Sequence, residues 1–195
     1  MANQIFTWIP IDKGASEELE PNILVTRFEL GKEQRRVKGA ARIGRINHNF
    51  EVFPAQFLAI KDFYLNRMDD GEWFWLPSYH YESTISATSS GTTVNVGDAT
   101  QFASSATGYP NKRKSNVFLA KVGANEVVTI ASTATGILNL TSALSTSYTT
   151  TDYLMIAYKC FFSESDNPSF QTDFYSRKYS GNIYAFKLVF REILY

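Results

Sequence analysis

The sequence is poor in the residues that build redox and metal centres: its 195 residues include one cysteine, Cys160, and two histidines. A single cysteine excludes an internal disulfide framework and a multi-cysteine zinc site. Cys160 stands between Lys159 and Phe161 in a strand-like run, which favours a buried and inert thiol over a reactive one. Little therefore remains for redox or metal chemistry.

Neither sign of charge is in excess, because 19 Lys and Arg residues balance 19 Asp and Glu residues. No global field draws the chain to nucleic acid or anionic lipid, and a net charge near zero favours association. No apolar run approaches the ~18 residues that a membrane-spanning helix needs. The start lacks a basic segment followed by an apolar stretch, so we expect no secretory signal. We accordingly expect the protein to be made in a reducing cytoplasm.

Catalytic motifs are also missing, since there is no nucleophile elbow, phosphate loop or dinucleotide fingerprint. His48 falls on the apolar face of its strand and is expected in the core or an interface. His80 is expected in a semi-exposed linker. The acidic segment 11–22, with Glu17, Glu18 and Glu20, is predicted to be a solvated loop, and Asp98 a turn residue. We expect no enzyme, cofactor or metal site.

One segment differs in composition from both of its flanks. From Thr84 to Thr151 roughly a third of the residues are Ser or Thr, and aromatic residues are thin. Both flanks are dense in aromatic residues that need a core. We therefore predict a host domain of residues 1–84 and 158–195 and an inserted peripheral β domain at 85–157, because exposed loops of a rigid scaffold tolerate insertions.

Hydrophobic periodicity assigns the main elements. Ile46 to Val52 alternates apolar and polar residues, the period of a half-buried strand. A helix is predicted over 54–68, opened by Pro54 and ended near Gly71. The host is expected to be a mainly-β sandwich of about six or seven strands with one helix. About five short strands make the insert a small barrel or sandwich, an OB-like barrel being one form.

The predicted host core includes the aromatic run at residues 73–75. Adjacent aromatic residues alternate faces in a strand, so packing beneath the helix is favoured over a sugar-stacking platform. The candidate core residues are Phe50, Phe57, Ile60, Tyr64, Trp73, Trp75, Phe186 and Leu188.

The stretch from Lys32 to Arg45 is strongly basic. Its cations are Lys32, Arg35, Arg36, Lys38, Arg42 and Arg45, set against Glu33 alone. They could contact phosphates, or form a hairpin arm that docks on an acidic patch of a neighbouring subunit, for which Glu17 to Glu20 is one candidate. A solvated hairpin is the third interpretation. The cluster Lys112-Arg113-Lys114, in a predicted loop, is a weaker candidate.

These features together resemble a known family. A strand leads through Phe28-Glu29-Leu30-Gly31-Lys32-Glu33-Gln34-Arg35 to a second strand, and a helix ending in Asp-Gly precedes Trp73-Phe74-Trp75-Leu76-Pro77. This order is similar to the tail-tip proteins of long-tailed bacteriophages, which include the distal tail proteins and the lambda minor tail protein M. The closing strand Tyr184 to Phe190 fits it too, so the resemblance covers about residues 20–80 and 175–195. The chain departs from the lambda pattern at Leu30, where that pattern has a Gly-Asp turn.

The resemblance implies a tail-tube-like fold and a structural role. Such proteins form hexameric rings that join the tail tube to the tip or baseplate hub, and their hairpin arms reach neighbouring subunits. It implies that the basic stretch is an inter-subunit arm and that the partners are further copies, the tube protein and the hub. The location would be the virion, assembled in the bacterial host cytoplasm, without nucleic-acid recognition. The alternative function is recognition of host-surface carbohydrate by the insert, which has few aromatic residues for such a site.

Overall fold

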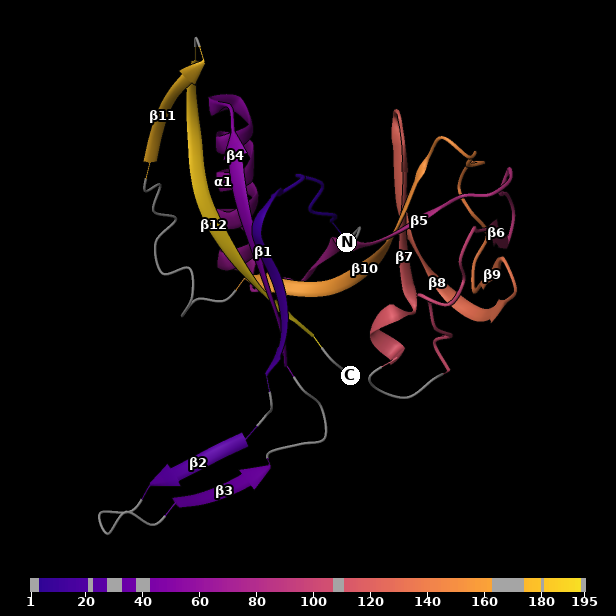
Figure 1. The fold of residues 1–195 in the computed structure, drawn as a ribbon, viewed down its shortest axis with the longest axis horizontal. Coiled ribbons are helices and arrows are strands. Elements are labelled where there is room, and N and C mark those ends of the chain that lie inside the picture. The colour runs from indigo at the N-terminus through magenta and orange to yellow at the C-terminus, as the bar shows by residue number, and fades with distance from the viewer. Residues whose placement is uncertain are drawn as a thin grey trace. The chain divides into compact units, whose positions relative to one another are not determined.

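The computed structural model describes residues 4–20, 23–27, 33–37, 43–106, 111–162, 174–179 and 181–193. Within these residues the protein is mainly β with a single α-helix, α1 (Pro54–Asp70), which confirms the predicted class. The chain divides into unit 1 (residues 1–7 and 75–158) and unit 2 (residues 8–74 and 159–195), drawn in Figure 1. Residues 1–7, 75–84 and 158, which the sequence assigns to the host, lie in unit 1.

Unit 2 contains an antiparallel sheet with β12 at its centre. Its strands are β1 (Ile11–Glu20), β4 (Ile43–Val52), β11 (Phe174–Tyr179), β12 (Gly181–Glu192) and the second part of β10 (Tyr153–Phe162). β4 pairs along one edge of β12, while β11 and β10 share the other edge at opposite ends of the strand. β1 pairs with β4 and is the last of the described strands on that side.

The prediction of a loop over residues 11–22 is wrong for residues 11–20, which form β1. The charges of this segment do not prevent strand formation, because an edge strand pairs on one side only and commonly carries charged side chains. Five residues of β1 from Ser16 to Glu20 pair in register with β4. Hydrogen bonding to β4 therefore overrides the weak strand signal of the sequence.

The helix follows the signals in the sequence and ends two residues beyond the predicted 54–68. Pro54 is its first residue, where no backbone N–H is needed. The Gln56 side chain accepts a hydrogen bond from the backbone N–H of Phe53 at 3.3 Å, which satisfies a donor at the start of the helix. Gly71 follows the last residue at a φ of 60°, the left-handed conformation of a glycine that ends a helix, so the predicted end near Gly71 is confirmed.

Aromatic residues pack α1 against the sheet of unit 2. The Phe57 ring stacks on Tyr184 with centroids 4.5 Å apart, and Tyr64 meets Phe162 at 4.8 Å. The predicted core residues that are buried are Phe50, Phe57, Ile60, Tyr64, Phe186 and Leu188. Trp73 and Trp75 are only half-buried. Phe74 between them is fully buried, with its ring 4.8 Å from that of Phe162.

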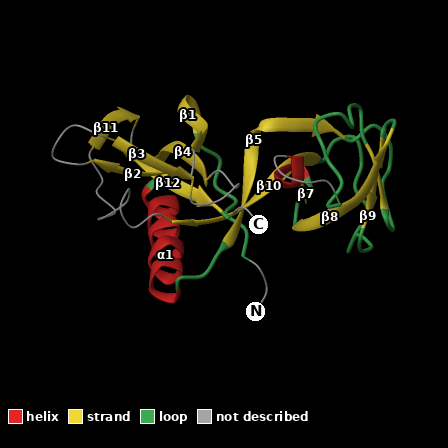
Figure 2. Cartoon of the chain, turned by 90° about the horizontal axis from the view of Figure 1, so that it is seen from below, coloured by secondary structure: helices red, strands yellow, loops and turns green. Residues whose placement is uncertain are grey.

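Unit 1 is a second β structure with its own core. Its elements are β5 (Phe74–Thr84, from Trp75 onward), β6 (Thr93–Asn95), the 3-10 helix η1 (Asn111–Lys114), β7 (Asn116–Lys121), β8 (Ala124–Ala134), β9 (Ile137–Leu140) and the first part of β10. The antiparallel order is β10-β7-β8-β9-β6, and Figure 2 shows the loops that join these strands. A proline commonly ends a strand, and the sequence thus predicts that the strand after the helix stops at Pro77. This prediction is wrong, because β5 passes through this buried proline.

The Glu126 carboxylate in β8 holds the loop that precedes β10 through hydrogen bonds. Glu126 Oε1 accepts hydrogen bonds from the Tyr148 hydroxyl at 3.0 Å and the Ser145 hydroxyl at 2.9 Å. The backbone N–H of Ser145 donates to the same carboxylate at 3.1 Å. Lys121 Nζ lies 5.5 Å from the centre of the Tyr148 ring. We call Glu126, Ser145 and Tyr148 the Glu126 clasp.

Candidate functional sites

The predicted inter-subunit arm corresponds in part to a hairpin of unit 2. β2 (Ile23–Arg27) and β3 (Glu33–Val37) form a two-stranded antiparallel sheet and, among the described residues, pair only with each other (Figure 1). Arg35 and Arg36 lie in β3, opposite Val25 and Leu24. The predicted arm residues Lys32, Lys38 and Arg42 lie outside the described residues.

Arg45 lies in the sheet and not in this hairpin. It is half-buried in β4, where its in-register neighbours are Glu18 of β1 and Arg191 of β12. The preceding residue, Gly44, leaves room for Glu192, since a Cβ at this position would overlap the Glu192 side chain. These contacts make Arg45 part of the central sheet.

The acidic candidate patch lies on the outermost strand of the same sheet. Glu17, Glu18 and Glu20 belong to β1, which pairs with β4 alone among the described residues. The Glu18 side chain is exposed and that of Glu17 is half-buried. Unit 2 thus combines an acidic edge strand with a basic hairpin strand whose described residues pair outside the main sheet.

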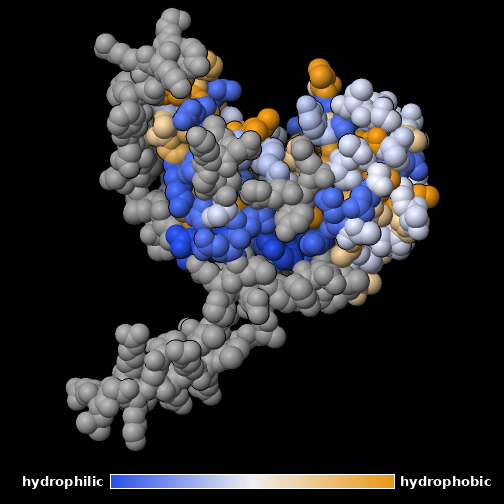
Figure 3. Space-filling view, viewed as in Figure 1, coloured by the Kyte–Doolittle hydropathy of each residue, from blue (hydrophilic) through white to orange (hydrophobic). Residues whose placement is uncertain are grey.

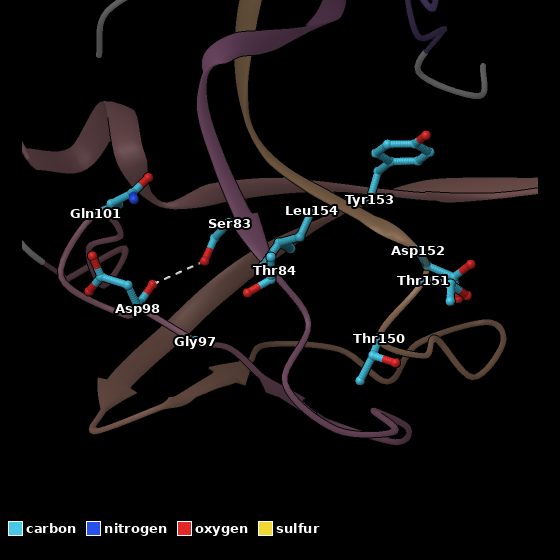
Figure 4. A pocket seen from close by; sticks show the side chains of 10 residues that line it. All are labelled: Ser83, Thr84, Gly97, Asp98, Gln101, Thr150, Thr151, Asp152, Tyr153 and Leu154. Carbon is cyan, nitrogen blue, oxygen red and sulfur yellow. Dashed lines mark hydrogen bonds between the residues drawn. The ribbon is translucent and has the colours of Figure 1, made fainter.

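A second candidate site is a polar hollow of about 500 Å³ within unit 1. It is formed by the end of β5, the turn after Gly97 and the segment that leads into β10 (Figure 4). Its lining residues are Ser83, Thr84, Gly97, Asp98, Gln101, Thr150, Thr151, Asp152, Tyr153 and Leu154. Sequence analysis did not find this site, because its segments are far apart in the chain.

Each of the two acidic residues of the hollow holds its own turn. Asp98 Oδ1 accepts hydrogen bonds from the Thr100 hydroxyl at 2.6 Å and the Thr100 backbone N–H at 2.8 Å. These bonds, the hydroxyl first, hold the pKa of Asp98 below its ordinary value, because they favour the charged form. Asp98 is therefore the turn residue that the sequence predicts. Asp152 Oδ2 accepts the backbone N–H of Thr149 at 2.8 Å.

Several groups in the hollow keep unused hydrogen-bonding capacity. Within the described residues, no hydrogen bond engages the hydroxyls of Thr84, Thr150 and Tyr153 or the Oδ1 atom of Asp152. Thr84, Thr150 and Tyr153 are exposed, the last at 60%. Figure 3 shows that the visible face of unit 1 is largely of intermediate hydropathy, as a Ser- and Thr-rich surface gives. The hollow is thus a solvent-facing site with free donors and acceptors.

The other candidates from the sequence are structural. His48 is buried in β4, with its ring 5.5 Å from that of Phe190, which confirms the core interpretation. His80 lies within β5 and not in a linker. Arg113 of the cluster at residues 112–114 lies 4.6 Å from the centre of the buried Tyr158 ring. The described residues contain no group of three or more His, Cys, Asp or Glu side chains that could hold a metal ion.

No helix in the described part of the chain is long and apolar enough to cross a membrane. No protein-family model matches the chain, and no curated protein matches it in sequence.

Proposed function

We propose that this protein is a structural component of the tail tip of a long-tailed bacteriophage. In this role it forms a ring, with six copies as the resemblance implies, that connects the tail tube to the tip or baseplate hub. The resemblance at about residues 20–80 and 175–195 supports this function. Its partners would be further copies, the tube protein and the hub, and the ring would be assembled in the host cytoplasm as part of the virion.

The observation that carries the proposal is the pair of opposite charges in unit 2. β3 brings Arg35 and Arg36 into a hairpin that pairs with no other described strand, while Glu18 is exposed on the edge strand β1. A contact between two different surfaces of identical subunits generates a ring when the rotation closes. The hairpin of one copy and the β1 edge of the next are two such surfaces.

Charge reversal tests this contact. The double variant Arg35→Glu/Arg36→Glu places acidic residues against an acidic strand, and like charges at an interface cost several kcal/mol. We expect the association constant of the ring to fall at least about tenfold. The measurements are light scattering after size-exclusion chromatography and negative-stain imaging, in which the unmodified protein should give six-fold rings.

The matched control is Lys61→Glu/Lys187→Glu, which makes the same change of net charge at two exposed residues of unit 2. We expect this control to assemble normally. Adding Glu18→Arg/Glu20→Arg to the hairpin variant should restore rings, because the charges are then exchanged. Unchanged assembly of the hairpin variant would refute the proposed contact between the hairpin of one copy and the β1 edge of the next. Failure of the unmodified protein to form rings, alone and with the tube protein, would count against the function itself.

A further inference from the structure

We propose that the polar hollow of unit 1 binds a neutral saccharide. All of its lining residues belong to unit 1, and none belongs to the hairpin or edge strand proposed for ring assembly. The two proposals can therefore succeed or fail separately.

The charges around the hollow select against other ligand classes. Among the residues that the structure describes, the lining contains no lysine, arginine or histidine, whereas Asp98 and Asp152 both belong to it. A phosphate or another anion would meet these two carboxylates, and like charges repel. The described residues also provide no set of three ligands for a metal ion. The ligand that fits best is neutral and rich in hydroxyl groups.

The unused polar groups match such a ligand. The Thr84 and Thr150 hydroxyls can each donate and accept hydrogen bonds, as sugar hydroxyls do. Asp152 uses Oδ2 for its own turn, so Oδ1 can accept from a ligand hydroxyl. A hydrogen bond with a charged acceptor is roughly twice as strong as a neutral one. Three polar contacts from two chain segments would fix the orientation of a pyranose ring.

Tyr153 supplies the apolar surface that a sugar also needs. Its ring is 60% exposed, and Figure 4 shows it at the edge of the group of lining side chains, projecting away from Thr84 and Thr150. Tyrosine combines an aromatic face with a polar hydroxyl, and the C–H face of a sugar ring can stack on the aromatic face. Leu154 follows on the opposite side of the strand and is fully buried, which anchors this segment in the core.

Hydrogen bonds within unit 1 fix the shape of the hollow. The Asp98–Thr100 and Asp152–Thr149 hydrogen bonds fix its two turns. Gly97 is held to β5 by its N–H, which donates to the Thr84 carbonyl at 2.9 Å. A side chain at Gly97 would come within 2.8 Å of the Thr84 hydroxyl, so this position has no room for one. Fixed loops reduce the entropy cost of binding.

The test is a titration of the full-length, isotope-labelled protein followed by nuclear magnetic resonance. The probes are cellotriose, maltotriose and tri-N-acetylglucosamine, each added up to about 10 mM, so that binding with a Kd of about 1 mM is also detected. We expect at least one of them to give saturable shifts at the backbone amides of Gly97, Thr150 and Tyr153. Inorganic phosphate and calcium chloride, added separately, should leave these amides unchanged.

Two variants assign the binding to the hollow. Tyr153→Ala removes the stacking surface and should weaken binding about tenfold, while Thr150→Val removes one hydroxyl and should weaken it about three- to tenfold. The matched controls are Val122→Ala and Thr92→Val, which change exposed residues of unit 1 outside the lining. Both controls should bind as the unmodified protein does.

Three results would overturn the proposal. The first is the absence of saturable shifts with all three oligosaccharides. The second is binding that Tyr153→Ala and Thr150→Val leave unchanged, since the sugar would then occupy another surface. The third is a stronger response of the hollow to phosphate or calcium than to any neutral sugar, which would identify an ion site instead.

Discussion

Removing the Tyr148 hydroxyl tests whether the Glu126 clasp stabilises unit 1. Tyr148 is fully buried, and its hydroxyl donates to Glu126 at 3.0 Å. Burial and then this hydrogen bond raise the pKa of Tyr148 above its ordinary value, so the hydroxyl remains a donor at neutral pH. A hydrogen bond to a charged group contributes about 1.5–3 kcal/mol. Because Glu126 keeps the two donors of Ser145, we expect Tyr148→Phe to cost about 1.5 kcal/mol.

A double-mutant cycle isolates this contact. The variants are Tyr148→Phe, Glu126→Ala and their combination. We expect the summed stability losses of the two single variants to exceed the loss of the double variant by about 1–2 kcal/mol, since neighbours in one network couple by about 0.5–3 kcal/mol. Unfolding in urea should be monitored by hydrogen exchange at peptides of unit 1, because a chain with two units need not unfold in one step. The control Tyr153→Phe removes an exposed hydroxyl and should change stability by less than about 0.5 kcal/mol.

The cycle has a clear adverse outcome. A coupling energy below about 0.3 kcal/mol, the usual scatter of independent sites, would mean that the Tyr148–Glu126 bond contributes nothing measurable. The loop before β10 would then be held by the burial of the Tyr148 ring alone, and the clasp would be a consequence of folding and not a cause of stability.

Two further predictions concern single side chains. Phe74→Ala should destabilise unit 2 by about 3–5 kcal/mol, because it empties a fully buried site, whereas Phe53→Ala, at a residue 56% exposed, should cost less than about 0.5 kcal/mol in the same urea titration. Thr100→Ala should raise the pKa of Asp98 towards its ordinary value, as a carbon-detected titration of the carboxyl group would show. An unchanged pKa would refute the hydrogen bond from the Thr100 hydroxyl to Asp98 as the cause of the low value. Because the pKa of Asp98 is lower in the folded protein than its ordinary value of about 3.9, its charged form stabilises the fold at higher pH, and this stabilisation is lost as the carboxylate is protonated. The variant should therefore lose less stability than the unmodified protein below about pH 4.

Much of the fold could be predicted because local signals agree with the tertiary structure. The strand β9 (Ile137–Leu140) is one of the short strands expected in the insert, and Gly123 and Gly136 adopt positive φ at the turns beside β8. Helix α1 begins at Pro54 because proline is favoured in the first turn. Where turn residues and periodicity coincide, the chain has few alternatives.

The missed features depend on partners that are distant in sequence. β1 has weak strand character of its own and is stabilised by pairing with β4. The polar hollow joins Thr84, Gly97 and Thr150, which only the folded unit 1 brings together. Its aromatic residue, Tyr153, lies just beyond the Ser- and Thr-rich stretch, so the scarcity of aromatics in that stretch did not describe the site.

The acidic edge strand β1 also bears on the life of the protein before it reaches any partner. A chain without net charge has no overall repulsion to keep newly made copies apart. An open strand edge is then a template for uncontrolled pairing into aggregates, and charged residues on the edge are a common protection against it. Glu17, Glu18 and Glu20 place local repulsion on the strand where two copies would otherwise join edge to edge. Neutralising them should therefore lower solubility even where it leaves the fold intact.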